Sequence, residues 1–160
     1  MLSTKQKKLR DSSKDNASNL VGYQVRKLTA QYDRDRVAEL WANLTMIQQM
    51  RGNSYWLDES NNSGLKWKEF IDKLTRRRGS RVIVFENAEE IFGFSYMLIE
   101  PLNANNPVRK TQTKAVIKEL YLEPAYRKQA RDIELAEMMR DCIGDMGIDF
   151  VEFDVKDLDI

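Results

Sequence analysis

Hydrophobic and polar residues follow two different periods along this chain, one typical of strands and one typical of helices. Residues 23–28 alternate, with Tyr23 and Val25 on one face, and this alternation predicts a first strand. Apolar residues then recur at steps of three and four, which predicts an amphipathic helix with Asp33 as its N-cap and an end near Gly52. The apolar positions of this helix are Val37, Leu40, Trp41, Leu44 and Ile47.

The middle of the chain predicts a loop, a second helix and a hairpin. The polar residues 53–64 surround the aromatic pair Tyr55 and Trp56 and predict the loop. The helix after it has Trp67, Phe70, Ile71 and Leu74 on one side and a run of arginines at 76–78 at its end. Residues 81–86 and 91–99 are β-branched and aromatic and flank a turn, so they predict the hairpin. Residues 101–111, with two prolines, predict a loop.

The last third of the chain predicts a strand, a helix and a final strand. The strand covers about 113–122 and ends at Pro124, the helix covers 130–146, and the last strand covers 150–155. Gly147 follows the helix as a C-cap glycine would. The apolar stripe of the helix is Ile133, Ala136, Met139, Ile143 and Met146. The element order is β-α-α-β-β-β-α-β, which predicts one α/β (α+β) domain over residues 21–160.

Composition narrows the class of protein. Residues 1–20 are basic and polar, so we expect a disordered tail. The chain contains neither a signal-peptide pattern nor a membrane-spanning apolar run, and its single cysteine fits a reducing compartment, so we expect a cytoplasmic protein without a membrane partner. A net charge of +1 argues against a domain that binds nucleic acid through its overall charge, so we expect no nucleic-acid partner.

The chain contains no histidine, and this absence restricts its chemistry. Catalysis through Ser-His or Cys-His pairs is excluded, and so are the usual zinc ligand sets, so we expect no metal site. Acid–base chemistry has to come from Glu, Asp, Tyr, Lys or water.

One segment combines the features of an anion site. The strand that ends at Leu122 is followed by a short basic loop and then by a helix, and the free N–H groups of a first helical turn favour anions. Arg127, Lys128 and Arg131 lie in or beside this loop. A pyrophosphate group is therefore a suitable ligand.

The same segment resembles the GNAT acetyltransferase superfamily. The resemblance rests on Leu120-Tyr121-Leu122, Glu123-Pro124-Ala125 and Tyr126-Arg127 before the long helix, on Gly93 after the hairpin turn, and on the element order. It implies a mixed central sheet with helices on both faces. It also implies an N-acetyltransferase that uses acetyl-coenzyme A as cosubstrate and a primary amine of a small molecule or a protein as acceptor.

The resemblance implies roles for individual residues. Main-chain groups of Leu120, Tyr121 and Leu122 would bind the pantetheine arm, and one N–H there would polarise the thioester carbonyl. Main-chain N–H groups of the loop and first helical turn would hold the pyrophosphate; these residues are Arg127, Lys128, Gln129, Ala130, Arg131 and Asp132. Ala130 and Asp132 stand where the family has glycine and glycine or alanine, and Asp132 is alternatively a helix N-cap.

Glu119 is the candidate general base, because alternation places Ile117, Glu119 and Tyr121 on one face of the strand. The alternative for Glu119 is a surface pair with Lys118. Tyr55 and Trp56 are candidates for lining a substrate pocket.

The chain ends at Ile160, soon after the fifth strand, which predicts an exposed sheet edge and a partner that completes the sheet, either in a homodimer or from another subunit. The alternative to an enzyme is a catalytically inactive GNAT-like interaction module.

Overall fold

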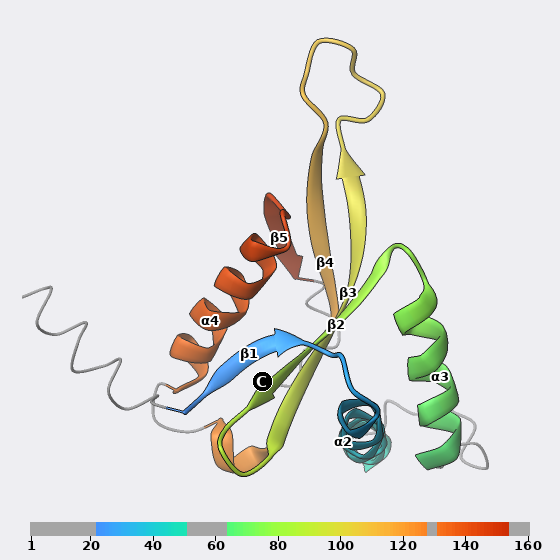
Figure 1. Cartoon of the computed structure of the whole chain (residues 1–160), viewed down its shortest axis with the longest axis vertical. Helices are drawn as coiled ribbons and strands as arrows, with labels where there is room; N and C mark the ends of the chain where they lie inside the picture. The colour runs from blue at the N-terminus through green and yellow to red at the C-terminus, as the bar shows by residue number, and fades with distance from the viewer. Residues whose placement is uncertain (1–21, 51–63, 128–130, 154–160) are drawn as a thin grey trace, which may run out of the picture.

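The computed structural model of this chain describes residues 22–50, 64–127 and 131–153 (Figure 1). The predicted tail and the candidates Tyr55, Trp56, Lys128, Gln129 and Ala130 lie outside these residues. The described elements follow the predicted order β-α-α-β-β-β-α-β. They are β1 (Gln24–Lys27), α2 (Gln31–Met50), α3 (Gly64–Arg76), β2 (Ser80–Glu86), β3 (Ile91–Leu102), β4 (Gln112–Leu122), the 3-10 turn η2 (Pro124–Tyr126), α4 (Arg131–Asp145) and β5 (Phe150–Phe153).

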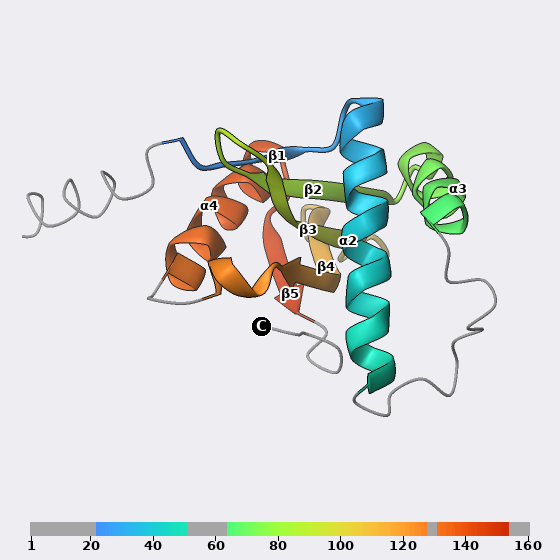
Figure 2. The same cartoon turned by 90° about the horizontal axis from the view of Figure 1, so that it is seen from below.

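The strands form a mixed sheet of five strands in the order β1-β2-β3-β4-β5. The first four strands pair antiparallel, and β5 pairs parallel with β4. Helices α2 and α3 lie on one side of the sheet and α4 on the other (Figures 1 and 2). Alternation along β2 divides the core, since Val82 and Val84 pack with α2 and α3 while Ile83 and Phe85 pack with α4. The expected mixed sheet with helices on both faces is confirmed.

The start of α2 differs from the prediction. The helix begins at Gln31, so Asp33 lies inside its first turn and the assignment of Asp33 as N-cap is wrong. Its carboxylate still caps the helix from within, because it accepts hydrogen bonds from the main-chain N–H groups of Thr29 (3.0 Å) and Ala30 (3.1 Å). The Arg26 guanidinium binds the same carboxylate at 2.7 and 2.9 Å and holds the pKa of Asp33 well below its usual range.

Helix α4 has a different buried face from the predicted stripe. Leu135, Met139 and Ile143 are buried against the sheet, whereas Ile133 is 62% exposed and Ala136 is exposed. The predicted stripe is therefore wrong at Ile133 and Ala136, because positions 135, 139 and 143 recur at a four-residue step that keeps one face on the sheet. The C-cap prediction is confirmed, since Gly147 has a φ of 78° and its N–H donates to the Gly144 carbonyl at 2.9 Å.

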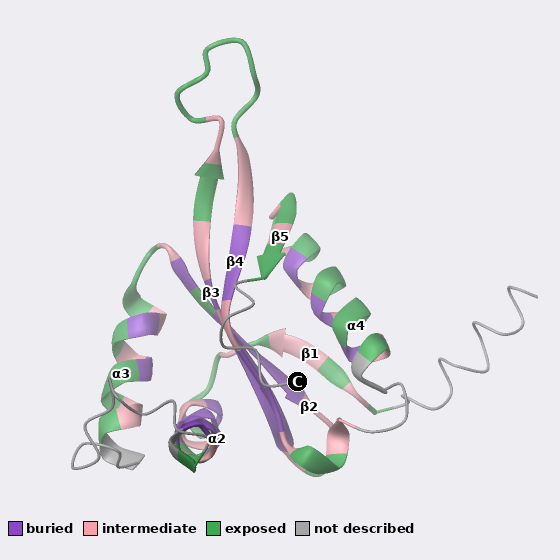
Figure 3. Cartoon of the chain, turned by 180° about the vertical axis from the view of Figure 1, so that it is seen from behind, coloured by how far each residue is buried: buried purple, intermediate pink, exposed green. Residues whose placement is uncertain are grey.

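Strands β3 and β4 form an arm that projects beyond the helices (Figure 1). β3 continues to Leu102, past the predicted end at 99, and Pro101 lies opposite Thr113. The loop 103–111 at the tip is mostly exposed, whereas the buried residues gather where the strands cross between the helices (Figure 3). Within the described ranges, no helix is both long and apolar enough to cross a membrane.

Candidate functional site

The described part of β5 pairs with one end of β4. Their pairing runs only from Lys114 opposite Phe150 to Ile117 opposite Phe153, while β4 itself continues to Leu122. On the other side of β4, Tyr96 lies opposite Glu119 and Met97 opposite Ile117, so Lys118 is the extra residue of a β-bulge. A bulge bends its strand, and here it follows directly after Ile117, which forms the last described pair with β5. Among the described residues, 118–122 have no strand partner on the β5 side.

The bulge also changes which side chains share a face. Ile117, Leu120 and Leu122 belong to the core beneath α4. Tyr121 belongs to the core beneath α2 and α3, and Glu119 lines a cavity on that same side. The predicted common face of Glu119 and Tyr121 is confirmed, but the inclusion of Ile117 is wrong because the extra residue at 118 shifts the alternation.

The main chain of β4 alternates in the same way. The Glu119 carbonyl accepts a hydrogen bond from the Ser95 hydroxyl of β3 at 3.0 Å, and the Glu123 N–H donates to the Phe92 carbonyl at 2.9 Å. Because N–H and C=O of one residue point to the same side of a strand and neighbouring residues alternate, Leu120 and Leu122 direct their main-chain groups into the opening beside β5. Tyr121 directs its main-chain groups toward β3.

A cavity of about 250 Å³ lies in this opening, on the α4 side of the sheet. Its lining is apolar: Phe85, Leu120, Leu122, Ile133, Leu135, Ala136, Met139 and Phe153. The exposure of Ile133 and Ala136 has its explanation here, since both border this cavity instead of the core.

Gly93 holds the end of β4 in place at this cavity. A Cβ atom on Gly93 would lie 2.5 Å from Leu122 Cδ2 and 2.6 Å from the Tyr121 carbonyl oxygen. Both distances are far inside van der Waals contact, so the close approach of β3 and β4 requires glycine here.

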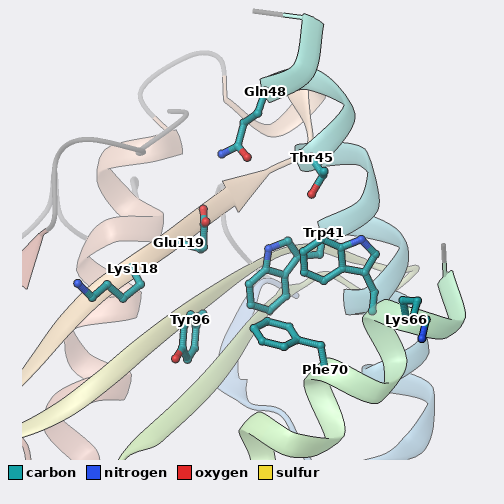
Figure 4. A pocket seen from close by; sticks show the side chains of 9 residues that line it. Trp41, Thr45, Gln48, Lys66, Phe70, Tyr96, Lys118 and Glu119 are labelled. Atoms are coloured by element: carbon teal, nitrogen blue, oxygen red, sulfur yellow. The ribbon is translucent and has the colours of Figure 1, made fainter. Parts of the chain in front are cut away.

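A second cavity of about 360 Å³ lies on the opposite face, between β4 and the helices α2 and α3 (Figure 4). Glu119 and Lys118 border it from β4 and Tyr96 from β3. The helices contribute Trp41, Thr45, Gln48, Lys66, Trp67 and Phe70. In Figure 4 the Glu119 carboxylate lies on the same side of the aromatic rings as Thr45 and Gln48.

The Tyr-Arg pair after β4 is held firmly by its neighbours. The Tyr126 ring stacks on Phe92 at 3.9 Å, and its hydroxyl donates to Glu90 (3.1 Å) and accepts from Asn87 (2.9 Å). Burial raises the pKa of Tyr126. Arg36 of α2 binds Glu90 and Glu123, and it therefore joins helix α2 to the residues on both sides of this segment.

Arg127 points back toward the strand. Its Nε donates to the Leu122 carbonyl at 2.6 Å, and its guanidinium lies 5.3 Å from the centre of the Tyr121 ring. Its main-chain N–H donates to the Pro124 carbonyl at 3.3 Å. Helix α4 begins at Arg131, so Asp132 lies within the helix and is not the N-cap that precedes it.

The structure thus brings Glu119, Leu120, Tyr121, Leu122 and Arg127 together at the end of β4. Trp41, Trp67 and Phe70 of the second cavity were predicted only as apolar helix positions, and Thr45, Gln48 and Lys66 were not predicted. The signal that marks them is spacing, because Trp41, Thr45 and Gln48 follow one helix face and two of the three are polar.

Neither a protein-family model nor a curated protein sequence matches this chain. Several solved structures, however, are similar to this chain. A possible acetyltransferase from Clostridium difficile 630 superposes with a TM-score of 0.59 at 16% identity, covering 84% of this chain and 80% of that one. An aminoglycoside acetyltransferase from an uncultured soil metagenomic sample, solved with sisomicin, gives 0.57 at 15% identity, with 84% and 78% covered. A transcriptional regulator from Bacillus halodurans C-125 gives 0.56 at 16%, with 84% and 82% covered.

This chain has the GNAT fold. The likeness extends over the element order and the mixed sheet. At sequence identities of 15–16% this likeness establishes the fold alone, and the chemistry depends on the residues at the site. Within the GNAT fold of this chain, two cavities border the end of β4 on opposite faces of one sheet.

Proposed function

We propose that this chain is an N-acetyltransferase that moves an acetyl group from acetyl-coenzyme A directly to a primary amine. The observation that carries the proposal is the position of Glu119 and Leu120. These consecutive residues open onto two cavities on opposite faces of the sheet, beside the stretch of β4 that no described residue of β5 pairs with. A thioester in one cavity and an amine in the other would meet at this opening.

The α4 side would hold the cosubstrate. The apolar cavity suits the pantetheine arm, and the main-chain groups of Leu120 and Leu122 that face the opening supply its hydrogen bonds. The Leu120 N–H is the donor placed to stabilise the oxyanion that forms on the thioester carbonyl. The start of α4 would receive the pyrophosphate through its free N–H groups, in the segment from Arg127 to Asp132.

Glu119 would act on the acceptor side. Its carboxylate takes a proton from the ammonium group, directly or through a water molecule, and the neutral nitrogen attacks the acetyl carbonyl carbon. The new C–N bond gives a tetrahedral oxyanion; when this collapses the C–S bond breaks, the sulfur leaves as a thiolate, and the nitrogen passes its second proton through water to that thiolate. An ordinary thiol has a pKa of about 8.5, so this thiolate can take its proton from water. Tyr126 is not needed as an acid, since its hydroxyl is bound by Glu90 and Asn87.

Calorimetric titration of acetyl-coenzyme A into three proteins tests the cosubstrate site. Ala136→Phe fills the cavity beside β4, whereas Ala104→Phe places the same ring on the exposed loop of the arm. We expect saturable binding to the wild type and to Ala104→Phe, and binding at least tenfold weaker to Ala136→Phe. Equal affinity of all three proteins would contradict the proposed cosubstrate site.

Glu119→Gln separates binding from chemistry. This variant keeps the size of the side chain and removes the base, so we expect unchanged affinity for acetyl-coenzyme A and a rate of amine acetylation reduced by about 10²-fold or more. An unchanged rate would remove Glu119 from the mechanism.

One observation favours the alternative of a catalytically inactive GNAT-like interaction module. Arg127 uses its main-chain N–H on Pro124 and its Nε on the Leu122 carbonyl, and both groups lie in the segment that would serve the cosubstrate. Under this alternative, acetyl-coenzyme A produces no heat at millimolar concentration in any of the three proteins.

A partner that completes the sheet remains a proposal. β5 is an edge strand of the described sheet, and its Phe150 and Phe153 are 49% and 42% exposed. We propose a second copy as this partner. Light scattering should then give the mass of a dimer for the wild type and of a monomer for Phe150→Ser.

A further inference from the structure

The second cavity has an aromatic wall with defined geometry. Trp41 and Trp67 are stacked, with ring centres 5.0 Å apart and planes 16° from parallel. Phe70 meets both indoles edge-on, at 5.3 and 5.7 Å, and Tyr96 lies 5.8 Å from Trp41. Phe70 is 39% exposed although Trp41 is buried, so the cluster presents a ring at its surface. Flat faces and edges of this kind pack best against another aromatic or planar apolar group.

The charges around the cavity select against a polycation. Among the described residues that line it, Glu119 is the one acid and Lys66 and Lys118 are the bases, with Lys66 also paired to Glu69 at 3.9 Å. One carboxylate can neutralise one ammonium group. Each further ammonium of a polyamine or an aminoglycoside would approach a lysine of like charge instead of a second acid.

The polar part of the cavity is small and lies on one side. Thr45 and Gln48 of α2 are buried, and both lie toward the Glu119 carboxylate in Figure 4. Their hydroxyl and amide oxygens can accept hydrogen bonds from the remaining N–H groups of one ammonium. The cavity thus divides into a polar end for one amine and an aromatic wall for its substituent.

We propose that the acceptor is a primary monoamine joined by a short chain to an aromatic ring, with the ring against Phe70 and Trp67 and the amine beside Glu119. This inference rests on the proposed acetyl transfer and names its acceptor class. An aromatic amine with a carboxylate and one without it share the ring and the ammonium, and the two are compared in the test.

The test measures binding before activity. Quenching of tryptophan fluorescence reports occupation of the cavity, because Trp41 and Trp67 border it, and it needs no acetyl-coenzyme A. The probes are 2-phenylethylamine, phenylalanine and spermidine. We expect 2-phenylethylamine to bind at least tenfold more tightly than spermidine. If phenylalanine binds more tightly than 2-phenylethylamine, its carboxylate lies near the lysines. If it binds more weakly, the site prefers the amine without a carboxylate. Either result supports an aromatic monoamine as acceptor.

Phe70→Ala is the test variant and Val108→Ala its control. Both truncate an exposed apolar side chain, but Val108 lies on the loop of the arm and is 90% exposed. Loss of a ring contact should raise the Kd of 2-phenylethylamine about three- to tenfold in Phe70→Ala and leave it unchanged in Val108→Ala.

Two outcomes overturn the acceptor class: spermidine that binds as tightly as 2-phenylethylamine, or an affinity for 2-phenylethylamine that Phe70→Ala does not change. Acetyl transfer to spermidine with none to 2-phenylethylamine overturns the class and leaves the acetyltransferase standing. Tight, Phe70-dependent binding of the aromatic amine without any transfer supports the cavity and refutes the proposed enzyme.

Discussion

Replacing Gly93 by alanine should destabilise this protein by separating β3 from β4. The added Cβ would meet Leu122 Cδ2 at 2.5 Å and the Tyr121 carbonyl oxygen at 2.6 Å, where ordinary contacts need about 3.5–4.0 Å. The leucine can change its rotamer. The carbonyl oxygen belongs to the main chain of β4, so the second clash is relieved only when the two strands move apart.

The expected magnitude is the balance of two effects. An extra methyl group forced into a well-packed interior costs about 1–3 kcal/mol. Alanine also restricts the unfolded chain more than glycine does, which returns about 0.4–1 kcal/mol. We therefore expect the free energy of unfolding of Gly93→Ala to fall by about 1–2 kcal/mol.

Urea denaturation followed by far-ultraviolet circular dichroism measures this change, with Gly144→Ala as the control. Gly144 lies within α4, and a Cβ there meets nothing within 4 Å. Alanine in a helix is favoured over glycine by about 0.5–1 kcal/mol, so the same substitution should stabilise at this position. If Gly93→Ala is as stable as the wild type or more stable, the close approach of β3 and β4 does not require glycine.

Two further predictions concern titrating groups. Asp33→Asn should lower the free energy of unfolding at pH 7 by about 2 kcal/mol, the usual value of hydrogen bonds to a charged group. Because the folded state holds the pKa of Asp33 below its unfolded value of about 3.9, the difference from wild type should be full above pH 5 and shrink as the pH falls below 4 in urea titrations; a difference independent of pH would contradict it. Burial raises the pKa of the Cys142 thiol, so less thiolate is present at pH 8, and a disulfide reagent should modify the folded protein more slowly than the urea-unfolded chain. Equal rates would show that the thiol is open to solvent.

The order and type of the elements could be predicted from the sequence because each element has a strong local period. The β-branched and aromatic runs 81–86 and 91–99 and the C-cap glycine at 147 are local signals, and the structure confirms the hairpin and the helix end. The errors arise at residues whose role is set by tertiary contacts and not by the local sequence. Asp33 looked like an N-cap, yet the partner that fixes its carboxylate is Arg26 of β1. Ile133 looked like a core residue, yet it borders the cavity beside β4.

The aromatic wall was missed for a different reason. Packing residues and ligand-binding residues have the same composition when the ligand is itself apolar, so Trp41 and Trp67 are equally suited to either role. Only the positions of Thr45 and Gln48 on the same helix face distinguish the two roles, and that distinction depends on knowing that β4 lies opposite.

The bulge at Lys118 is the feature on which the whole site depends, and strict alternation hides it. Without the bulge, a regular strand with the same residues would continue the phase set by Ala115 and Ile117, and Glu119 would point into the apolar core beneath α4. With it, Glu119 turns to the cavity between α2 and α3 while Leu120 turns to the opening beside β5. A single inserted residue therefore places a carboxylate and a main-chain N–H on adjacent residues but toward different cavities. That arrangement is what transfer between two separately bound substrates requires.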